Sequence, residues 1–243
     1  MEKINKLCEI INNAKRAVFF GGAGVSTESG IPDFRGQDGI YKMEYDYPPE
    51  EILSHDFFEN HPEEFWRFYF NKMVYTEAKP NKAHLKIAEM EKAGKLAAVI
   101  TQNIDGLHQA AGSKTVYELH GSIHRNHCTK CGKFFDLDYI HSCRDKLVAL
   151  CDRCGGMIKP DVVLYGESLS TETLTESVKS IANADVMIVG GTSLNVYPAA
   201  GLLNYFNGDN LVLINKSSTP YDSKANLIIN DRIGEVLGQV VIE

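Results

Sequence analysis

The stretch from residue 98 to residue 124 contains polar and titratable side chains of the kinds found in active sites. An apolar run at 98–100 stops abruptly at Gln102, Asn103 and Asp105, and His120 follows. In open parallel sheets the ligand crevice lies beyond the carboxyl ends of the strands, so these side chains are expected in such a crevice. A neutral imidazole can accept a proton near pH 7. The stretch therefore predicts proton transfer in a polar cleft, with a satisfied core histidine as the alternative for His120.

A glycine turn comes earlier in the chain. The apolar run at 17–20 leads directly into Gly21-Gly22-Ala23-Gly24-Val25-Ser26-Thr27. A strand, a glycine turn and a helix start together make a pyrophosphate site, because free N–H groups there attract anions. The usual third glycine is absent, since Thr27 stands three residues after Gly24, and no acidic residue closes a second strand about 20 residues on. A tight turn without a ligand remains the alternative.

A loop is expected after this turn. Pro32 stops any helix and exposes Asp33, Phe34 and Arg35, where an aromatic and an arginine could cover a bound nucleotide. One core phenylalanine beside a solvated arginine is the alternative. Residues 36–49 are rich in Gly, Tyr and Pro without a period, which predicts a flexible loop that could cover the cleft.

Two Cys-x-x-Cys pairs separated by 19 residues follow His120. Cys128, Cys131, Cys151 and Cys154 supply four thiolates for one tetrahedral zinc ion, the arrangement of a closed structural site. With no position open to water, the zinc should hold a small module together instead of catalysing a reaction. Three further candidate ligands are expected to be bystanders: His127, His141 and Cys143.

The remaining pattern places these residues on an α/β fold. Buried strands are predicted at 17–20, 98–100, 186–189 and 211–214, and helices at about 4–14, 62–75, 81–93 and 171–182. Strand ends rich in small and polar residues indicate a doubly wound parallel, Rossmann-like sheet with a smaller inserted zinc-binding module. Within one domain spanning 1–243, the Rossmann-like part is expected at 14–36, 96–122 and 160–243. A helical part with the flexible loop is expected at 37–80, and the zinc module at 124–158.

Composition narrows the class of protein. The chain has 243 residues, 44% of them hydrophobic, and a formal net charge of −7. Such a balance argues against a nucleic-acid or anionic-membrane surface and would suit a lysine-rich substrate. The first residues lack the apolar core of a signal peptide, and no apolar run reaches the roughly 18 residues of a membrane helix. A soluble, cytoplasmic protein is expected, and a reducing compartment favours metal over disulfides.

Taken together, these stretches resemble the sirtuins, NAD-dependent protein lysine deacylases, in a short prokaryotic-type form. The resemblance rests on motifs that occur in the family's order: Gly22-Ala23-Gly24-Val25-Ser26, Gly30-Ile31-Pro32-Asp33-Phe34-Arg35, Thr101-Gln102-Asn103-Ile104-Asp105, Leu119-His120-Gly121, the two cysteine pairs, and Gly191-Thr192-Ser193-Leu194.

The resemblance implies roles for individual residues. His120, Asn103 and Asp105 would be catalytic. NAD would contact Ala23, Ser26, Thr27, Asp33, Phe34, Arg35, Gln102, Asn103, Ile104, Asp105, His120, Thr192, Ser193, Asn215, Lys216 and Asp231. The acyl-lysine peptide would contact Val163, Tyr165, Gly166, Glu167, Asn195 and Val196, and an extended peptide could add its backbone hydrogen bonds to strand edges at 166–167 and 195–196.

The implied reaction transfers an acetyl group from acetyl-lysine to ADP-ribose. Its products would be nicotinamide, O-acetyl-ADP-ribose and free lysine, with His120 accepting a proton from a ribose hydroxyl. Acetylated proteins or peptides would be the partners. Two alternatives remain: mono-ADP-ribosyl transfer to protein, and a non-catalytic module that binds NAD and zinc.

Acyl preference follows from one further comparison. Sirtuins that favour succinyl or malonyl groups have a Tyr-x-x-Arg pair before the Pro-Asn-x-x-His segment, which here begins at Pro80. The corresponding residues are Trp66 and Tyr69, so neither offers a cation to an acidic acyl group. Acetyl is therefore the expected substrate.

Overall fold

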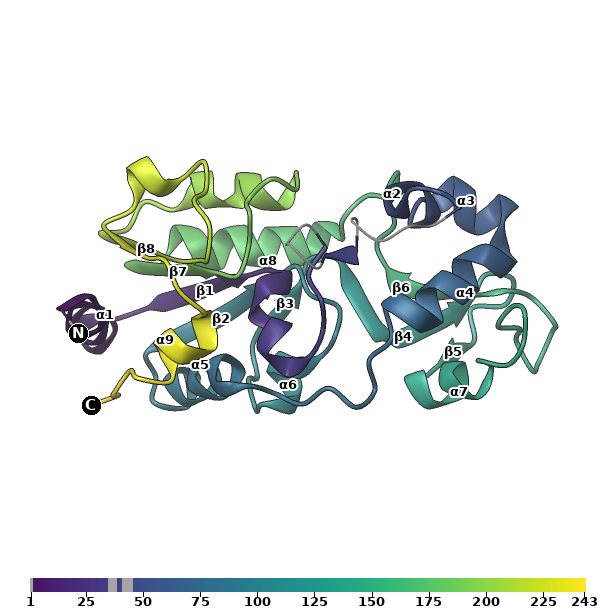
Figure 1. The fold of residues 1–243 in the computed structure, drawn as a ribbon, viewed down its shortest axis with the longest axis horizontal. Coiled ribbons are helices and arrows are strands. Elements are labelled where there is room, and N and C mark those ends of the chain that lie inside the picture. The colour runs from purple at the N-terminus through teal and green to yellow at the C-terminus, as the bar shows by residue number, and fades with distance from the viewer. Residues whose placement is uncertain (1, 35–38, 41–45) are drawn as a thin grey trace.

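A six-stranded parallel sheet forms the larger part of the molecule in a computed structural model that describes residues 2–34, 39–40 and 46–243 (Figure 1). Its order is β3-β2-β1-β7-β8-β9. The strands are β1 (Ala17–Gly21), β2 (Leu96–Thr101), β3 (Val116–Glu118), β7 (Val186–Gly190), β8 (Asn210–Ile214) and β9 (Leu227–Ile229). The order reverses direction at β1, so the crevice expected at such a switch point lies beyond the ends of β1 and β7. The predicted doubly wound sheet is confirmed.

Helices cover both faces of this sheet. On β1, Ala17 and Phe19 pack into one core, whereas Val18 and Phe20 pack into the other, as the two-residue period of a strand requires. The first core is closed by α1 (Glu2–Asn13), α5 (Lys82–Lys92) and α9 (Ile233–Leu237). The second is closed by α8 (Thr171–Ala182) and the 3-10 helix η4 (Ala199–Tyr205). The short helix α6 (Leu107–Ala110) follows β2, and η5 (Asp222–Lys224) precedes β9.

The smaller part of the molecule has its own sheet and core. Three antiparallel strands in the order β5-β4-β6 are joined by four helices. These elements are β4 (Gly121–Cys128), β5 (Phe134–Phe135), β6 (Ile158–Val162), α2 (Pro49–Ile52), α3 (His55–Asn60), α4 (Pro62–Lys72) and α7 (Leu137–Ser142). The aromatic residues of α4 are all buried in this core. Figure 1 shows the smaller part beside the carboxyl ends of the parallel strands.

The structure differs from the sequence predictions at several places. The turn after β1 leads into two 3-10 helices, η1 (Ala23–Val25) and η2 (Thr27–Ser29), and not into an α-helix. Helices α2 and α3 were not predicted, because one or two turns are too short to show a period. Strand β6 pairs with β4 in the small sheet, although residues 160–162 were predicted with the Rossmann-like part. The predicted Arg35 and most of the loop at 36–49 lie outside the described residues.

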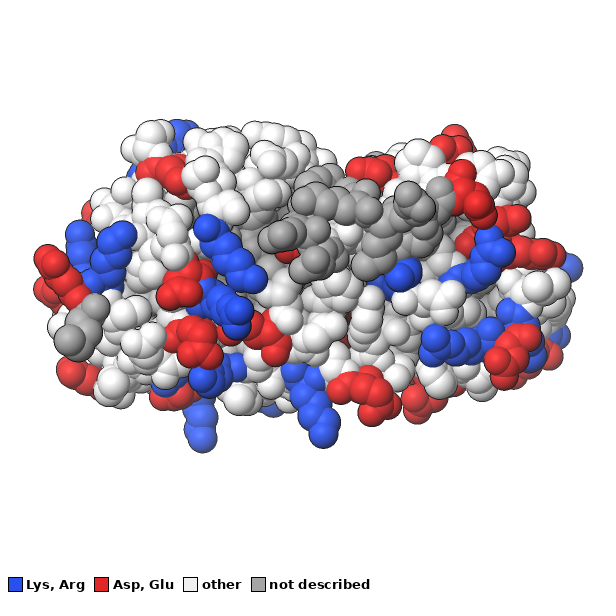
Figure 2. Space-filling view, in the orientation of Figure 1, with Lys and Arg blue, Asp and Glu red and all other residues white. Residues whose placement is uncertain are grey.

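Charges are mixed over the surface. On the face drawn in Figure 2, Lys and Arg side chains are interspersed with Asp and Glu. Across the described ranges of the chain, we find no helix with the length and apolar character to cross a membrane.

Candidate active site

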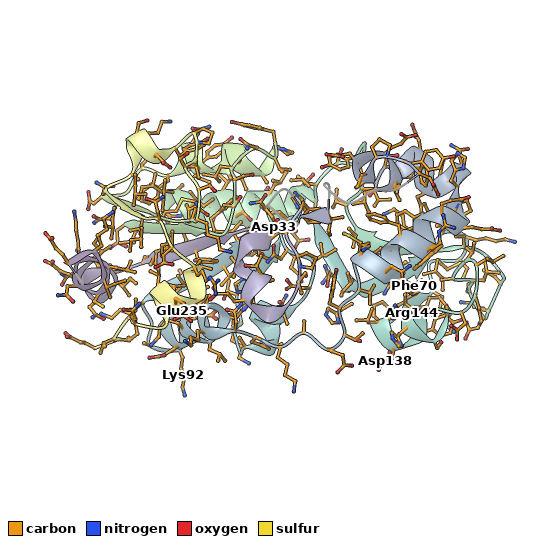
Figure 3. The ribbon with its side chains drawn as sticks, viewed as in Figure 1. Asp33, Phe70, Lys92, Asp138, Arg144 and Glu235 are labelled. Atoms are coloured by element: carbon orange, nitrogen blue, oxygen red, sulfur yellow. The ribbon has the colours of Figure 1, made fainter. Side chains whose placement is uncertain are left out.

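One cavity of about 660 Å³ lies between the two parts of the molecule. The segments that follow β1, β2, β7 and β8 form one side of it, and residues 162–167 and the end of α4 form the other. Figure 3 shows Asp33 at this junction, on the segment that leaves the glycine turn. Every predicted cofactor or substrate residue within the described chain lines this cavity: Ala23, Ser26, Thr27, Asp33, Phe34, Gln102, Asn103, Ile104, Asp105, His120, Val163, Tyr165, Gly166, Glu167, Thr192, Ser193, Asn195, Val196, Asn215, Lys216 and Asp231.

A hydrogen-bonded network joins the ends of β1 and β2. The Ser26 hydroxyl donates to Asp105 Oδ2 at 2.6 Å and accepts from Asn103 Nδ2 at 3.1 Å. Asp105 Oδ1 accepts from the Leu107 amide at 2.9 Å, which fixes the second carboxylate oxygen. Burial raises the pKa of Asp105, against the opposing effects of the Ser26 and Leu107 hydrogen bonds. The network thus holds a desolvated carboxyl and an amide in fixed orientations beside the cavity.

His84 extends this network and was not predicted as a site residue. Its Nδ1 accepts from the Asn81 amide at 3.3 Å, in a capping box at the start of α5. Nε2 therefore carries the proton of the neutral ring and lies 3.5 Å from Ser26 Oγ. Burial lowers the pKa of His84 to about 4, so the ring is neutral at pH 7. The spacing Asn81-x-x-His84 was a sequence signal for the cap but not for its contact with Ser26.

His120 has one bonded and one open ring nitrogen. Nδ1 donates to the Gln102 carbonyl at 3.0 Å, which leaves the lone pair on Nε2. Among the described residues, none forms a hydrogen bond with Nε2. Burial lowers the pKa of His120, and the bond to Gln102 only partly opposes this effect. At neutral pH the imidazole is therefore uncharged and can accept a proton from a group in the cavity.

The glycine turn and the end of β7 are packed closely together. A Cβ at Gly24 would lie 2.8 Å from the Gly191 Cα and carbonyl oxygen, and a Cβ at Gly22 would lie 2.8 Å from Thr192 Cβ. Glycine is thus required at these positions because two strand ends meet there. This packing reason is separate from the predicted one, which was the close approach of a ligand. Gln102 Nε2 donates to Thr192 Oγ1 at 3.0 Å and ties β2 to the same turn.

Asn215 offers a hydrogen-bond donor to a ligand. Its Oδ1 accepts from the Thr192 amide at 2.9 Å. Its Nδ2 is buried and finds no partner within residues 2–34, 39–40 and 46–243, although Asn215 lines the cavity. A buried N–H without a partner costs about 1–3 kcal/mol, so a ligand acceptor there would be stabilising. The open donor of Asn215 and the glycine turn after β1 therefore offer hydrogen-bond donors to a polar ligand in this cavity.

The expected peptide wall has a different backbone arrangement from the one predicted. Residues 166–167 and 195–196 are not strands. Tyr165 instead forms a parallel bridge with Ser54, because its amide donates to Leu53 and its carbonyl accepts from His55. One edge of this segment is thus already paired within the protein. Val163 remains next to the catalytic candidate, since its amide donates to the His120 carbonyl at 2.9 Å.

The end of α4 also lines the cavity, although none of its residues was predicted to do so. Lys72, Met73 and Tyr75 come from the end of α4 and the segment after it. Trp66 and Tyr69 do not line the cavity and lie in the small core.

The four predicted zinc ligands converge. The Sγ atoms of Cys128, Cys131, Cys151 and Cys154 all lie within 4.8 Å of one another, and none of these cysteines forms a disulfide. The distance is 3.5 Å from Cys128 Sγ to Cys154 Sγ and 3.7 Å from Cys131 Sγ to Cys151 Sγ. Four sulfurs at about 2.3 Å from one zinc ion would be about 3.8 Å apart, so the cluster fits a tetrahedral Zn²⁺. Cys143 is outside the cluster, and His127 bonds to Asp161 at 2.8 Å.

Known proteins match this chain over most of its length. The sequence model of the Sir2 family matches residues 22–198. A Clostridium acetobutylicum protein named NAD-dependent protein deacetylase is 58% identical over 243 residues, covering 99% of each chain. A Clostridium tetani protein of the same name is 57% identical over 245 residues, covering 100% of this chain and 99% of the other.

Solved structures agree with these matches. A structure of Sir2 with p53 peptide and NAD+ has a TM-score of 0.85 and 41% identity. A structure of Sir2 bound to acetylated peptide has a TM-score of 0.85 and 39% identity. Each covers 96% of this chain and 95% of the other.

Proposed function

This chain belongs to the Sir2 family, the sirtuins, and on that premise we propose that it is an NAD-dependent protein lysine deacetylase. With one water, acetyl-lysine and NAD give free lysine, nicotinamide and O-acetyl-ADP-ribose. One observation carries the proposal: the open Nε2 of His120 faces the same cavity as the Ser26–Asp105 network and the 163–167 segment.

The chain's own residues divide the work. NAD, when bound, supplies the ADP-ribose acceptor and the nicotinamide leaving group. His120 accepts a proton at Nε2 from a ribose hydroxyl, because Nδ1 is committed to Gln102. Asn103 and Asp105 present fixed polar groups to the ribose and the nicotinamide, since Ser26 orients both. Preorganised groups of this kind avoid reorganisation during the reaction. Phe34 would cover the reacting end and exclude water.

Zinc has a structural role in this proposal. The four thiolates Cys128, Cys131, Cys151 and Cys154 would hold one ion, which leaves no open coordination position for a substrate. We also propose a cytoplasmic location, because cysteines without disulfides are typical of a reducing compartment.

The proposal is tested by incubating the purified protein with one acetyl-lysine peptide, with and without NAD. Peptide mass and released nicotinamide are followed together. We expect loss of acetyl matched by an equal amount of nicotinamide, only when NAD is present. Nicotinamide without deacetylation would instead indicate ADP-ribosyl transfer or NAD hydrolysis. If zinc-loaded protein gives neither product, the interpretation that remains is a non-catalytic module that binds NAD and zinc.

A further inference from the structure

The carboxylate of Glu167 is fully engaged inside the protein. Oε1 lies 2.8 Å from His55 Nδ1, and Oε2 accepts from Lys159 Nζ at 3.1 Å and from the Leu164 amide at 2.9 Å. Burial alone would raise the pKa of Glu167, but the Leu164 amide, His55 and Lys159 lower it overall. Glu167 is therefore ionised at neutral pH and is committed to these donors, although it lines the cavity.

These contacts fix the shape of residues 163–167. The Glu167 amide donates to the Leu164 carbonyl at 3.0 Å while its carboxylate accepts from the Leu164 amide, so the turn is closed from both sides. Gly166 adopts a φ of 90° within the turn, a conformation that other residues rarely take. On its outer edge, the backbone of Tyr165 pairs with Leu53 and His55. The wall that faces the peptide is thus shaped by Glu167 and supported by the start of α3.

His55 links this wall to two carboxylates. Its Nδ1 faces Glu167, and its Nε2 lies 3.3 Å from Glu59 Oε1, one turn along α3. A neutral ring has one N–H and can donate to only one of them, whereas the protonated ring donates to both. Within the described chain, Glu167, Glu59 and Lys159 are the charged groups that act on this ring. The hydrogen bond to Glu167 is the main reason that the pKa of His55 is raised above 6.5.

We propose that His55 is a positioning residue that holds the peptide-binding segment at 163–167 through Glu167, and that its protonation tightens the binding of acetyl-lysine peptides. The inference rests on the proposed function, because it takes 163–167 as the peptide wall. It assigns no contact between His55 and the substrate. The tighter binding is present below about pH 6.5 and is lost as pH rises through the raised pKa of His55.

The test measures peptide affinity without turnover. A fluorescent acetyl-lysine peptide is titrated without NAD from about pH 6 to about pH 9, and its Kd is measured by anisotropy. The variants are His55→Ala, His55→Gln and His61→Gln. At the acidic end we expect His55→Ala to weaken binding by about two- to fivefold, the size of effect of a half-exposed ion pair. His55→Gln keeps a neutral donor, so its Kd should be intermediate and should lack the pH dependence of the wild type. His61 is an exposed histidine at the end of the same helix, and its variant should match the wild type.

Two results would overturn the proposal: equal affinity of His55→Ala and wild type at the acidic end, or the same pH dependence in His55→Gln as in the wild type. Failure of the wild type to bind the peptide would overturn both this inference and the proposed function. Binding that responds to His55 as expected, without deacetylation when NAD is added, would count against the proposed function alone.

Discussion

The two parts of the molecule contribute different walls to one cavity. The Rossmann-like part contributes polar side chains whose orientations are fixed at the ends of parallel strands, such as Asp105 and His120. The small part contributes mainly apolar side chains and backbone, including Leu53, Ile123 and Leu164. The side chains suited to proton transfer thus follow the ends of strands in the six-stranded sheet. The wall assigned to peptide recognition belongs to the part with the three-stranded sheet.

The two parts also differ in what stabilises them. The parallel sheet lies between two hydrophobic cores, whereas the small sheet has one core beside the four-thiol cluster. A small unit buries less apolar surface per residue, so a metal can contribute a large share of its stability. The comparison therefore predicts that activity can be lost without loss of stability or of zinc.

The largest effect is expected at the base in the Rossmann-like part. His120→Ala should lower NAD-dependent deacetylation by about 100- to 10,000-fold, the range for loss of a general base. Zinc content and thermal unfolding should stay close to wild type, because His120 lies outside the thiol cluster. His141→Ala, at an exposed histidine of α7, is the matched control and should keep full activity. Near-normal turnover by His120→Ala would contradict the assignment.

Loss of the metal should act on the small part. Cys128→Ala should abolish zinc binding and destabilise this part by at least about 4 kcal/mol, as expected for loss of a structural metal. Activity should fall with it, because 163–167 is anchored on β6 and α3. Zinc content, circular dichroism and thermal unfolding measure these changes.

Cys143→Ala is the control for the metal, since Cys143 is buried in the small core but lies outside the cluster. It should cost about 1–2 kcal/mol through a small cavity and keep one zinc per chain. Zinc loss in this variant, or full zinc in Cys128→Ala, would show that the ligand set is different.

The relative rates on different acyl groups test the apolar wall that the small part contributes to the cavity. Acetyl should be removed at least about tenfold faster than succinyl from one peptide, because neither Trp66 nor Tyr69 offers a cation, and a carboxylate buried without one is costly. Rates on the two peptides, measured in wild type and in Lys72→Ala, check this expectation. Lys72 is the comparison because it lines the cavity, whereas Trp66 and Tyr69 do not. Faster desuccinylation that disappears in Lys72→Ala would assign Lys72 to acidic acyl groups and refute the preference for acetyl.

The smallest effect is expected in the pH profile. A general base acts when unprotonated, and burial lowers the pKa of His120, so activity should be lost only as pH falls through a value below 6.5. The rate at saturating peptide and NAD should change less than about twofold between pH 6.5 and pH 7.5. A midpoint at or above 6.5 would contradict a buried, neutral His120. Because the peptide is saturating, the pH dependence of peptide binding expected from His55 does not affect this rate.

The ends of the main parallel strands and the four-thiol cluster could be predicted from the amino-acid sequence alone. Apolar runs that stop at polar residues located the ends of β1, β2, β7 and β8, because the residues of a buried strand change from apolar to polar where the strand leaves the core. Cysteine spacing located the four thiols, since two Cys-x-x-Cys pairs are local signals of a shared ion.

Contacts between residues far apart in the chain could not be predicted from the sequence. His84 reaches Ser26 across 58 residues, and His55 reaches Glu167 across 112. Strand β6 joined the small sheet through pairing with β4, and the glycines after β1 met Gly191. A local sequence pattern indicates the hydrophobic periodicity and the capping residues of one helix or strand at a time. These contacts depend on how elements pack, and that is set by the whole core.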